Sequence, residues 1–168
     1  MDTHTRRAWL AGMAAPGLAA ALPQAASAKV CSVPVDRRSF ERYAKLFCDH
    51  DPAFMQYYTA DVVLDIGSRG QIKTPQAIYD YYGKMRENFV ETMDVLFFCS
   101  DAGGVAVELS GSYRCIKDAD NSAIFNRSIH EGEVRRHRGI VLYTLEGGKF
   151  KLIRGPKAEV TSDWRMES

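Results

Sequence analysis

Residues 36–67 constrain the fold of this chain more than any other stretch. Their first half predicts an amphipathic helix, because apolar side chains recur three, four and seven positions apart, at Phe40, Tyr43, Ala44 and Phe47. Asp36 precedes this helix and predicts an N-cap, since its carboxylate can accept hydrogen bonds from unpaired first-turn amides. A helix with one apolar face needs a layer to pack against, which the rest of the chain must supply.

The residues that follow predict two more helices and a first strand. Pro52 restricts the residue before it and fits a first turn, so the first helix ends near Asp51 and a short helix follows over 52–58. An apolar strand at 62–64 is closed by Asp65 and the turn formers 67–70. Thr74 and Pro75 then start a third helix, predicted to run to about Glu91.

The second half of the chain predicts long strands. Alternating or β-rich segments cover 93–100, 105–116, 133–145 and 150–160, separated by Gly-containing turns at 101–104 and 146–149. Residues 122–132 carry no clear pattern, and the tail from Thr161 is polar. We therefore expect an α+β domain in which three N-terminal helices pack on one face of a bent antiparallel sheet.

The order of helix, aspartate corner, short helix, Ala60-to-Asp65 strand (ADVVLD) and glycine turn resembles the opening of the NTF2-like, or SnoaL-like, superfamily. The resemblance implies a cone over residues 36–160 that encloses a mostly apolar cavity. Similar proteins include cofactor-free isomerases, dehydratases, cyclases and lyases, while others only bind or assemble. The fold alone therefore leaves the function open.

Residues 1–28 are interpreted as a targeting segment and excluded from the fold. The run from Thr5 to Leu10, with the pair Arg6-Arg7, resembles a twin-arginine export signal. An apolar run too short to span a bilayer follows, and then an A-x-A cleavage site at 26–28. We expect a periplasmic protein exported in the folded state, with a linker at 29–35 and a flexible tail at 161–168.

Composition narrows the possible partners. Lys plus Arg number 22 against 21 Asp plus Glu, so no global field draws the chain to nucleic acid or, once the leader is removed, to a membrane. No clustered ligand set predicts a metal, and no phosphate loop or nucleotide fingerprint predicts a cofactor. The four cysteines, Cys31, Cys48, Cys99 and Cys115, allow three disulfide pairings, between which the sequence does not choose.

Comparison with ketosteroid isomerases disfavours that activity. Tyr43 falls where their oxyanion-donor tyrosine stands, but the base position falls on Ile66 and the second acid on Ile140. Isoleucine moves no protons. A slip of one residue would put Asp65 in the base position.

The match with dehydratases of the same superfamily is also incomplete. Their aspartate at the end of the first helix matches Asp49 or Asp51, but their histidine position falls on Asp94. A His–Asp dyad therefore requires His130 or His137 to reach in from elsewhere. Two carboxylates whose pKa values are separated by burial remain an alternative.

These comparisons leave a ring of candidate residues, each with a structural alternative as a core, capping or surface side chain. The candidates for catalysis are Tyr43, Asp49, Asp65 and Arg138. The candidates for substrate binding are Tyr58, Asp94, His130, Ile140, Leu142 and Arg154. Counting back from the Gly147-Gly148 turn puts Ile140 at the second-acid position, and with it the other even-numbered side chains of the strand at 133–145 toward the cavity.

The sequence favours a cofactor-independent lyase, dehydratase or isomerase acting on a small hydrophobic molecule, aromatic or cyclic. The alternative is a non-catalytic binding or assembly module of the same fold. Three helices leave one face of a single sheet uncovered, and an uncovered apolar face is normally buried by a partner. We therefore expect a homodimer through the outer face of the sheet.

Overall fold

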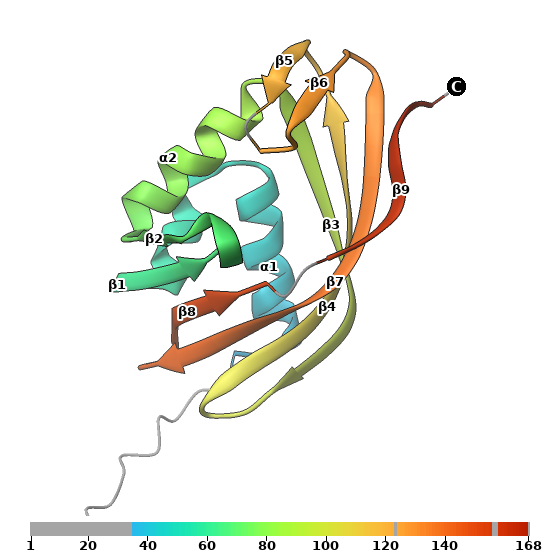
Figure 1. Cartoon of the computed structure of the whole chain (residues 1–168). Helices are drawn as coiled ribbons and strands as arrows, with labels where there is room; N and C mark the ends of the chain where they lie inside the picture. The colour runs from blue at the N-terminus through green and yellow to red at the C-terminus, as the bar shows by residue number, and fades with distance from the viewer. Residues whose placement is uncertain (1–34, 123, 156–157, 168) are drawn as a thin grey trace, which may run out of the picture.

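Two α-helices lie on one face of a strongly curved sheet (Figure 1). The structure is a computed structural model and describes residues 35–122, 124–155 and 158–167. The leader predicted at 1–28 and nearly all of the predicted linker lie outside the described residues. The α+β class expected from the sequence is confirmed, and the layer of helices precedes most of the sheet in the chain.

The helical layer contains two α-helices rather than three. α1 (Arg37–Cys48) begins as predicted, with the Asp36 carboxylate accepting from Ser39 N at 2.6 Å. The predicted second helix is a 3-10 helix, η1 (Pro52–Tyr57), capped by Asp51. His50 takes a left-handed conformation (φ 54°) just before it, so the chain turns sharply between the two.

The predicted third helix is α2 (Pro75–Arg86), and it ends five residues earlier than expected. Strand β3 (Phe89–Ser100) begins where the helix was expected to continue. The Asn88 side chain donates to the carbonyls of Lys117 and Asp118 at 3.2 and 3.0 Å, which ties the end of α2 to the residues that follow β4 (Gly104–Cys115). This long-range anchor has no local sequence signal.

The main sheet is mixed, which corrects the expectation of a purely antiparallel one. Its order is β2-β1-β8-β7-β4-β3, and β1 (Tyr58–Asp65) runs parallel to β8 (Lys149–Arg154). The remaining members of this path are β2 (Gln71–Lys73), β4 (Gly104–Cys115) and β7 (Glu133–Glu146). Between β1 and β2 lies a short 3-10 turn, η2 (Gly67–Arg69).

β7 is long enough to pair with two different strands along one edge. Its C-terminal residues from Leu142 pair with β8, and its first residues, up to Arg138, pair with β9 (Glu159–Met166). The tail expected to be flexible from Thr161 is thus largely a sheet strand. Thr161, Asp163 and Arg165 are exposed, while Trp164 is buried.

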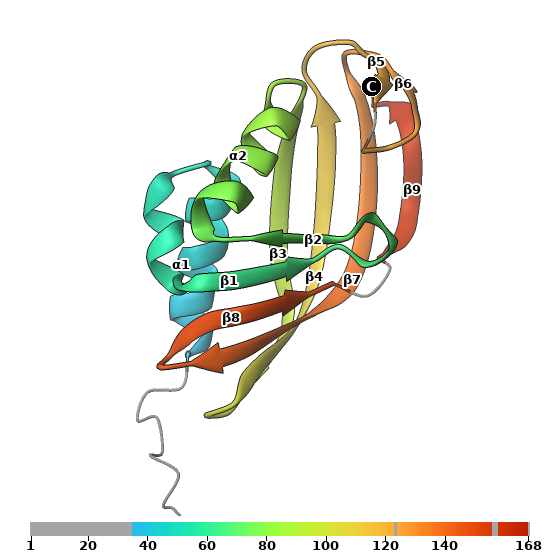
Figure 2. The same ribbon diagram turned by 60° about the vertical axis from the view of Figure 1, so that its left-hand side comes forward.

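A small hairpin of β5 (Ala119–Ser122) and β6 (Arg127–Ile129) fills the stretch in which no clear sequence pattern was found. It lies at one end of the sheet, near the C-terminal end of α2 (Figures 1 and 2). Beneath it a second core cluster contains Met85, Phe89, Cys115, Ile129 and Trp164.

Strand register decides which side chains face the helices. Val105, Val107 and Leu109 of β4 are buried on the inner face, and they pair with Tyr143, Val141 and Gly139 of β7. The odd-numbered residues of β7 therefore face inward, and the expectation for the even-numbered set is wrong. Both faces of β7 carry apolar residues near its end, so the alternation alone did not distinguish them.

Candidate functional site

Three polar side chains stand side by side across the inner face of the sheet. Glu91 of β3 pairs in register with Tyr113 of β4, and Tyr113 pairs with Arg135 of β7. Side chains opposite each other on neighbouring strands share one face at close range. These three, together with Arg86 and His137, are called the polar row below.

Glu91, the one carboxyl of the row, is deeply buried, with 6% of its surface exposed. The Tyr113 hydroxyl donates to its Oε1 at 2.9 Å, and Arg86 Nη2 lies 3.6 Å from its Oε2. Burial raises the pKa of Glu91, and the Arg86 charge and the Tyr113 hydrogen bond offset part of that rise. The carboxyl thus holds its proton more tightly than a surface glutamate does.

Arg86 comes from the last turn of α2 and is held among aromatic rings. Its Nη2 donates to the carbonyl of Phe47 at 2.5 Å, and its Cζ lies 4.9 Å from the Phe47 ring centroid and 5.5 Å from that of Tyr82. Its Nε and Nη1 are buried without a hydrogen-bond partner. A fixed guanidinium therefore lies directly behind the Glu91 carboxylate.

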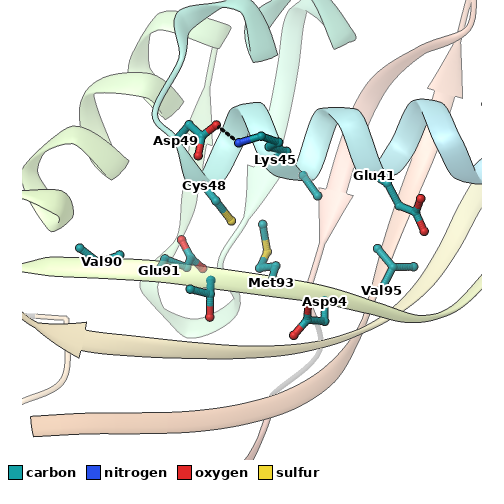
Figure 3. Close-up of a pocket in the computed structure, with 11 residues that line it drawn as sticks. Glu41, Lys45, Cys48, Asp49, Val90, Glu91, Met93, Asp94 and Val95 are labelled. Carbon is teal, nitrogen blue, oxygen red and sulfur yellow. Dashed lines mark hydrogen bonds and ion pairs between the residues drawn. The ribbon is translucent and has the colours of Figure 1, made fainter.

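A groove between α1 and β3 leads to this carboxyl (Figure 3). Its volume is about 550 Å³, and it is lined by Glu41, Ala44, Lys45, Cys48, Asp49 and Val90–Val95. Figure 3 shows Cys48 and Glu91 directed toward the space between the helix and the strand. Burial raises the pKa of the Cys48 thiol to about 12, so this cysteine is a weak nucleophile at neutral pH.

His137 stacks on the other side of Tyr113. The two ring centroids are 4.9 Å apart and the planes differ by 16°. Gly111 makes room for the imidazole, since a Cβ at that position would lie 2.9 Å from His137 Nε2 and 2.7 Å from the Thr92 carbonyl. Burial, and then the nearby Arg135 charge, lower the pKa of His137 and keep the ring neutral.

Tyr43 and Tyr58 were both predicted as site residues, and the structure brings them together. Their hydroxyls are 2.9 Å apart, and both rings are buried. Phe40, Tyr143 and Phe150 pack around Tyr43 with centroids 5.0–6.2 Å away. Burial raises the pKa of both phenols, and the centre of the cone is filled by aromatic side chains.

The predicted acids lie nearer the surface. Asp49 forms an exposed ion pair with Lys45 at 2.6 Å on the rim of the groove, and Asp94 belongs to the groove lining. Asp65 accepts from Gly67 N at 2.9 Å and so caps a turn. None of the three lies beside the Tyr43–Tyr58 pair in the described interactions.

The remaining predicted residues do not face the interior. Arg138 pairs with Glu108 at 2.8 Å on the outer face, where Ile140 and Leu142 are also exposed. The side chain of His130 is 70% exposed, with its Nδ1 3.9 Å from Asp118.

Arg154, a candidate for substrate binding, is exposed. A register shift between Thr144 and Leu145 lets Phe150 and Ile153 both point inward, so that Arg154 points outward beside Leu142.

Sequence reasoning missed Arg86, Glu91, Tyr113 and His137 as a group. One signal for Glu91 was available, because it interrupts an alternating apolar series of Phe89, Met93 and Val95. Assigning residues up to Glu91 to a helix concealed that alternation. Arg86 also lies eight positions after buried Ile78, on the same face of its helix.

The described residues contain neither a metal-binding cluster nor a membrane-spanning helix. No group of three His, Cys, Asp or Glu side chains in ranges 35–122, 124–155 and 158–167 is arranged to hold a metal ion. Within the same ranges no helix is long and apolar enough to cross a membrane.

The fold is that of the NTF2-like cone, as comparison with solved structures shows. A candidate polyketide cyclase of Pseudomonas putida KT2440 is 17% identical with a TM-score of 0.57, covering 70% of this chain and 87% of its own. An LEH-like epoxide hydrolase of Mycobacterium tuberculosis is 11% identical with a TM-score of 0.54, covering 73% and 80%.

The protein Rv0760c of Mycobacterium tuberculosis, in complex with estradiol-17β-hemisuccinate, is 17% identical with a TM-score of 0.53, covering 70% and 89%. No protein-family model and no curated protein matches the sequence. At these identities the likenesses establish the fold, and the polar row must supply the argument for function.

Proposed function

We propose that the protein is a cofactor-independent lyase, dehydratase or isomerase that acts on a small hydrophobic molecule, aromatic or cyclic, by acid–base chemistry at Glu91. The observation that carries the proposal is a buried carboxyl with a raised pKa at the floor of the groove. Perturbed carboxyls beside an open groove are typical of acid–base sites.

Each member of the row has a chemical role in this proposal. Glu91 accepts a proton from an acidified C–H bond of the substrate and returns it to another atom. Tyr113 holds Oε1 in place, and the Arg86 charge stabilises the negative charge that the reaction creates. Oε2 is covered in this state, so the Glu91 side chain must move farther into the groove for Oε2 to reach a substrate, which breaks the 3.6 Å contact with Arg86.

The proton-transfer role expected of Asp49 moves to Glu91 in this scheme. Asp49 is half exposed and already paired with Lys45, so water screens its charge. The relatives named above, a candidate cyclase, an epoxide hydrolase and a protein holding a steroid hemisuccinate, support a small hydrophobic molecule as the substrate class.

A second candidate function is ligand binding without turnover. It is favoured by the centre of the cone, where the hydroxyls of Tyr43 and Tyr58 hydrogen-bond to each other among packed aromatic rings. Each hydroxyl of this pair already has the other as its hydrogen-bond partner, so both polar groups are satisfied within the aromatic core.

One experiment separates the two functions and does not require the natural substrate. Cyclic ketones are incubated with the protein in D₂O, and the exchange of their acidic C–H protons is followed by NMR. Catalysed exchange supports the enzyme. Ligands retained in native mass spectrometry, with no exchange in any of them, support the binding module.

We also propose that the protein forms a homodimer through the outer face of the sheet. Phe97, Ile140 and Leu142 are 56%, 50% and 38% exposed there, and Phe97 and Ile140 flank Glu108 in register. Ile140→Asp is expected to turn the dimer into a monomer in sedimentation at micromolar concentration, because it buries an unpaired charge. Ile116→Asp, just past the C-terminal end of β4, serves as the control and should leave the dimer intact. A wild-type monomer would contradict the proposal.

The proposal includes export by the twin-arginine route. Replacing Arg6-Arg7 by Lys-Lys is expected to leave the precursor in the cytoplasm, because the arginine pair is what the translocase for folded proteins recognises. Cell fractionation and the mass of the N-terminus measure this. Normal processing after Ala28 in the Lys-Lys variant would refute the twin-arginine assignment.

A further inference from the structure

Three buried side-chain nitrogens beside the second core cluster have no hydrogen-bond partner in the described structure. They are Arg135 Nε, Trp164 Nε1 and His137 Nδ1, each without exposed surface or a hydrogen-bond partner. Trp164 as a whole is only 7% exposed. Buried N–H groups in native proteins are nearly always paired, so an acceptor from outside the described chain is expected here.

The three donors come from adjacent positions on two paired strands. Arg135 and His137 are two residues apart on the inner face of β7, a separation of about 7 Å. Trp164 lies on β9, which pairs with β7 through Val134–Arg165 and Arg136–Ser162 on either side of it. A group of the size of a carboxylate spans such a separation.

Apolar rings border the donors on the side of the second core. The Phe125 centroid lies 5.0 Å from that of Trp164 and 5.5 Å from Arg135 Cζ, and Phe89 lies 5.5 Å from Trp164. The nearest carboxylate oxygen, Asp163 Oδ1, is 3.7 Å from Arg135 Nε and accepts from the backbone of Trp164. At 3.7 Å this contact is an ion pair too long to be a hydrogen bond, so the hydrogen bond of Arg135 Nε is left unmade.

The chemistry of the unpartnered atoms indicates what is missing. Along the polar row and Trp164 the unpartnered buried atoms are four nitrogen donors (two on Arg86, one each on Arg135 and Trp164), one imidazole nitrogen and a single acceptor, Glu91 Oε2. The deficit is one of acceptors, and among the described residues the positive charge of Arg135 is balanced only by the Asp163 carboxylate, whose side chain is 70% exposed. An anionic oxygen pair satisfies both.

We propose that Arg135, His137 and Trp164 form a subsite that binds the carboxylate of a small aromatic acid. The ring of the acid packs toward Phe125. Neutral His137 donates from Nδ1 in the tautomer that the carboxylate selects. The subsite does not require catalysis at Glu91, which lies two strands away beyond Tyr113.

Trp164 supplies the readout. The chain has two tryptophans, Trp9 and Trp164, so Trp9→Phe in the full chain leaves Trp164 as the single reporter. Sodium benzoate is titrated while the fluorescence and the indole N–H resonance of Trp164 are recorded. We expect saturable binding with a downfield shift of that N–H, and binding of the neutral isostere benzamide at least about tenfold weaker.

Matched variants identify the donors. Arg135→Gln is expected to weaken benzoate binding by about tenfold or more, the cost of one charge-assisted hydrogen bond. Arg136→Gln changes the neighbouring arginine, which faces outward to Glu167, and should leave binding unchanged. Glu91→Gln should also bind benzoate normally, even though it loses any exchange activity.

Three results would overturn the subsite. They are a linear benzoate response without saturation, equal binding by Arg135→Gln, and an indole N–H that contacts a long-lived water and is unaffected by benzoate. If Arg135→Gln does not fold, the indole shift of the Trp9→Phe protein still decides between benzoate and water.

Discussion

Glu91→Gln is expected to lower protein-catalysed C–H exchange by about 10²–10⁴-fold, the range for losing a general acid–base group. Glutamine keeps the shape of the side chain and can still accept from Tyr113, but it takes up no proton. It also leaves Arg86 without its buried counter-charge, so some loss of stability is expected. Exchange is measured by NMR in D₂O beside a thermal melt of the same sample.

Asp49→Asn is the matched control for this prediction. It is an equally isosteric change on the rim of the same groove, at a residue whose carboxylate is about half exposed. Its expected cost is at most ~1 kcal/mol of stability, with exchange unchanged. Full exchange activity in folded Glu91→Gln, or its loss in Asp49→Asn, would contradict the roles given to the two carboxyls.

Phe40→Ala is expected to lower the free energy of unfolding by ~3–5 kcal/mol. Phe40 is fully buried and contacts the rings of Tyr43, Phe98, Tyr143 and Phe150. Its removal leaves a cavity that these rings, packed from several elements, cannot fill without leaving their positions. Urea denaturation followed by circular dichroism measures the change.

Phe97→Ala removes the same side chain from the outer face, where 56% of it is exposed. In the dissociated protein it should cost less than ~1 kcal/mol. If Phe40→Ala changed the free energy of unfolding only slightly, the centre of the cone would be a loosely packed cavity and not a close-packed core. The Tyr43–Tyr58 pair would then be open to a ligand.

Local sequence signals predicted the helix starts well. The Asp36 cap, the proline at 52 and the Thr74–Pro75 start each act within one turn of the chain, and all three appear in the structure. The apolar spacing that includes Phe40 and Phe47 also identified the buried face of α1. These signals are local, so one sequence contains them in full.

The sheet was less predictable because its decisive features depend on register. Even and odd residues of β7 are similarly apolar near Leu142, and one register step exchanges the two faces. The shift beside Leu145 that turns Arg154 outward also has no residue signature. The parallel pairing of β1 with β8 joins strands that are far apart in the sequence, and no local pattern encodes it.

The candidate site was difficult to predict for the same reason. Tyr43 and Tyr58 were predictable because each lies on an apolar face near the start of the chain. To predict the polar row, one must know where α2 ends and how three strands pair in register, because its members come from all four elements. Because Glu91 was assigned to a helix, its place on a strand was missed, and the row was therefore not predicted.

The raised pKa of Glu91 has a consequence for stability. A carboxyl whose pKa is higher in the folded than in the unfolded state binds more protons when folded. Its contribution is fully present below the unfolded pKa and is lost as the pH rises through the folded pKa. This pH dependence is opposite in sign to that of a surface carboxylate stabilised by an ion pair. Asp61 is an example, because its hydrogen bond with Lys151 lowers the pKa of Asp61.

The most direct test of the proposed site is the titration of the Glu91 carboxyl carbon by ¹³C NMR. The resonance is assigned by its absence from Glu91→Gln. We predict a titration midpoint above the ordinary value of 4.5, because burial outweighs the Arg86 charge and the Tyr113 hydrogen bond. A midpoint at or below 4.5 would show a permanently ionised partner of Arg86, and Glu91 would then be a structural ion pair and not a proton carrier.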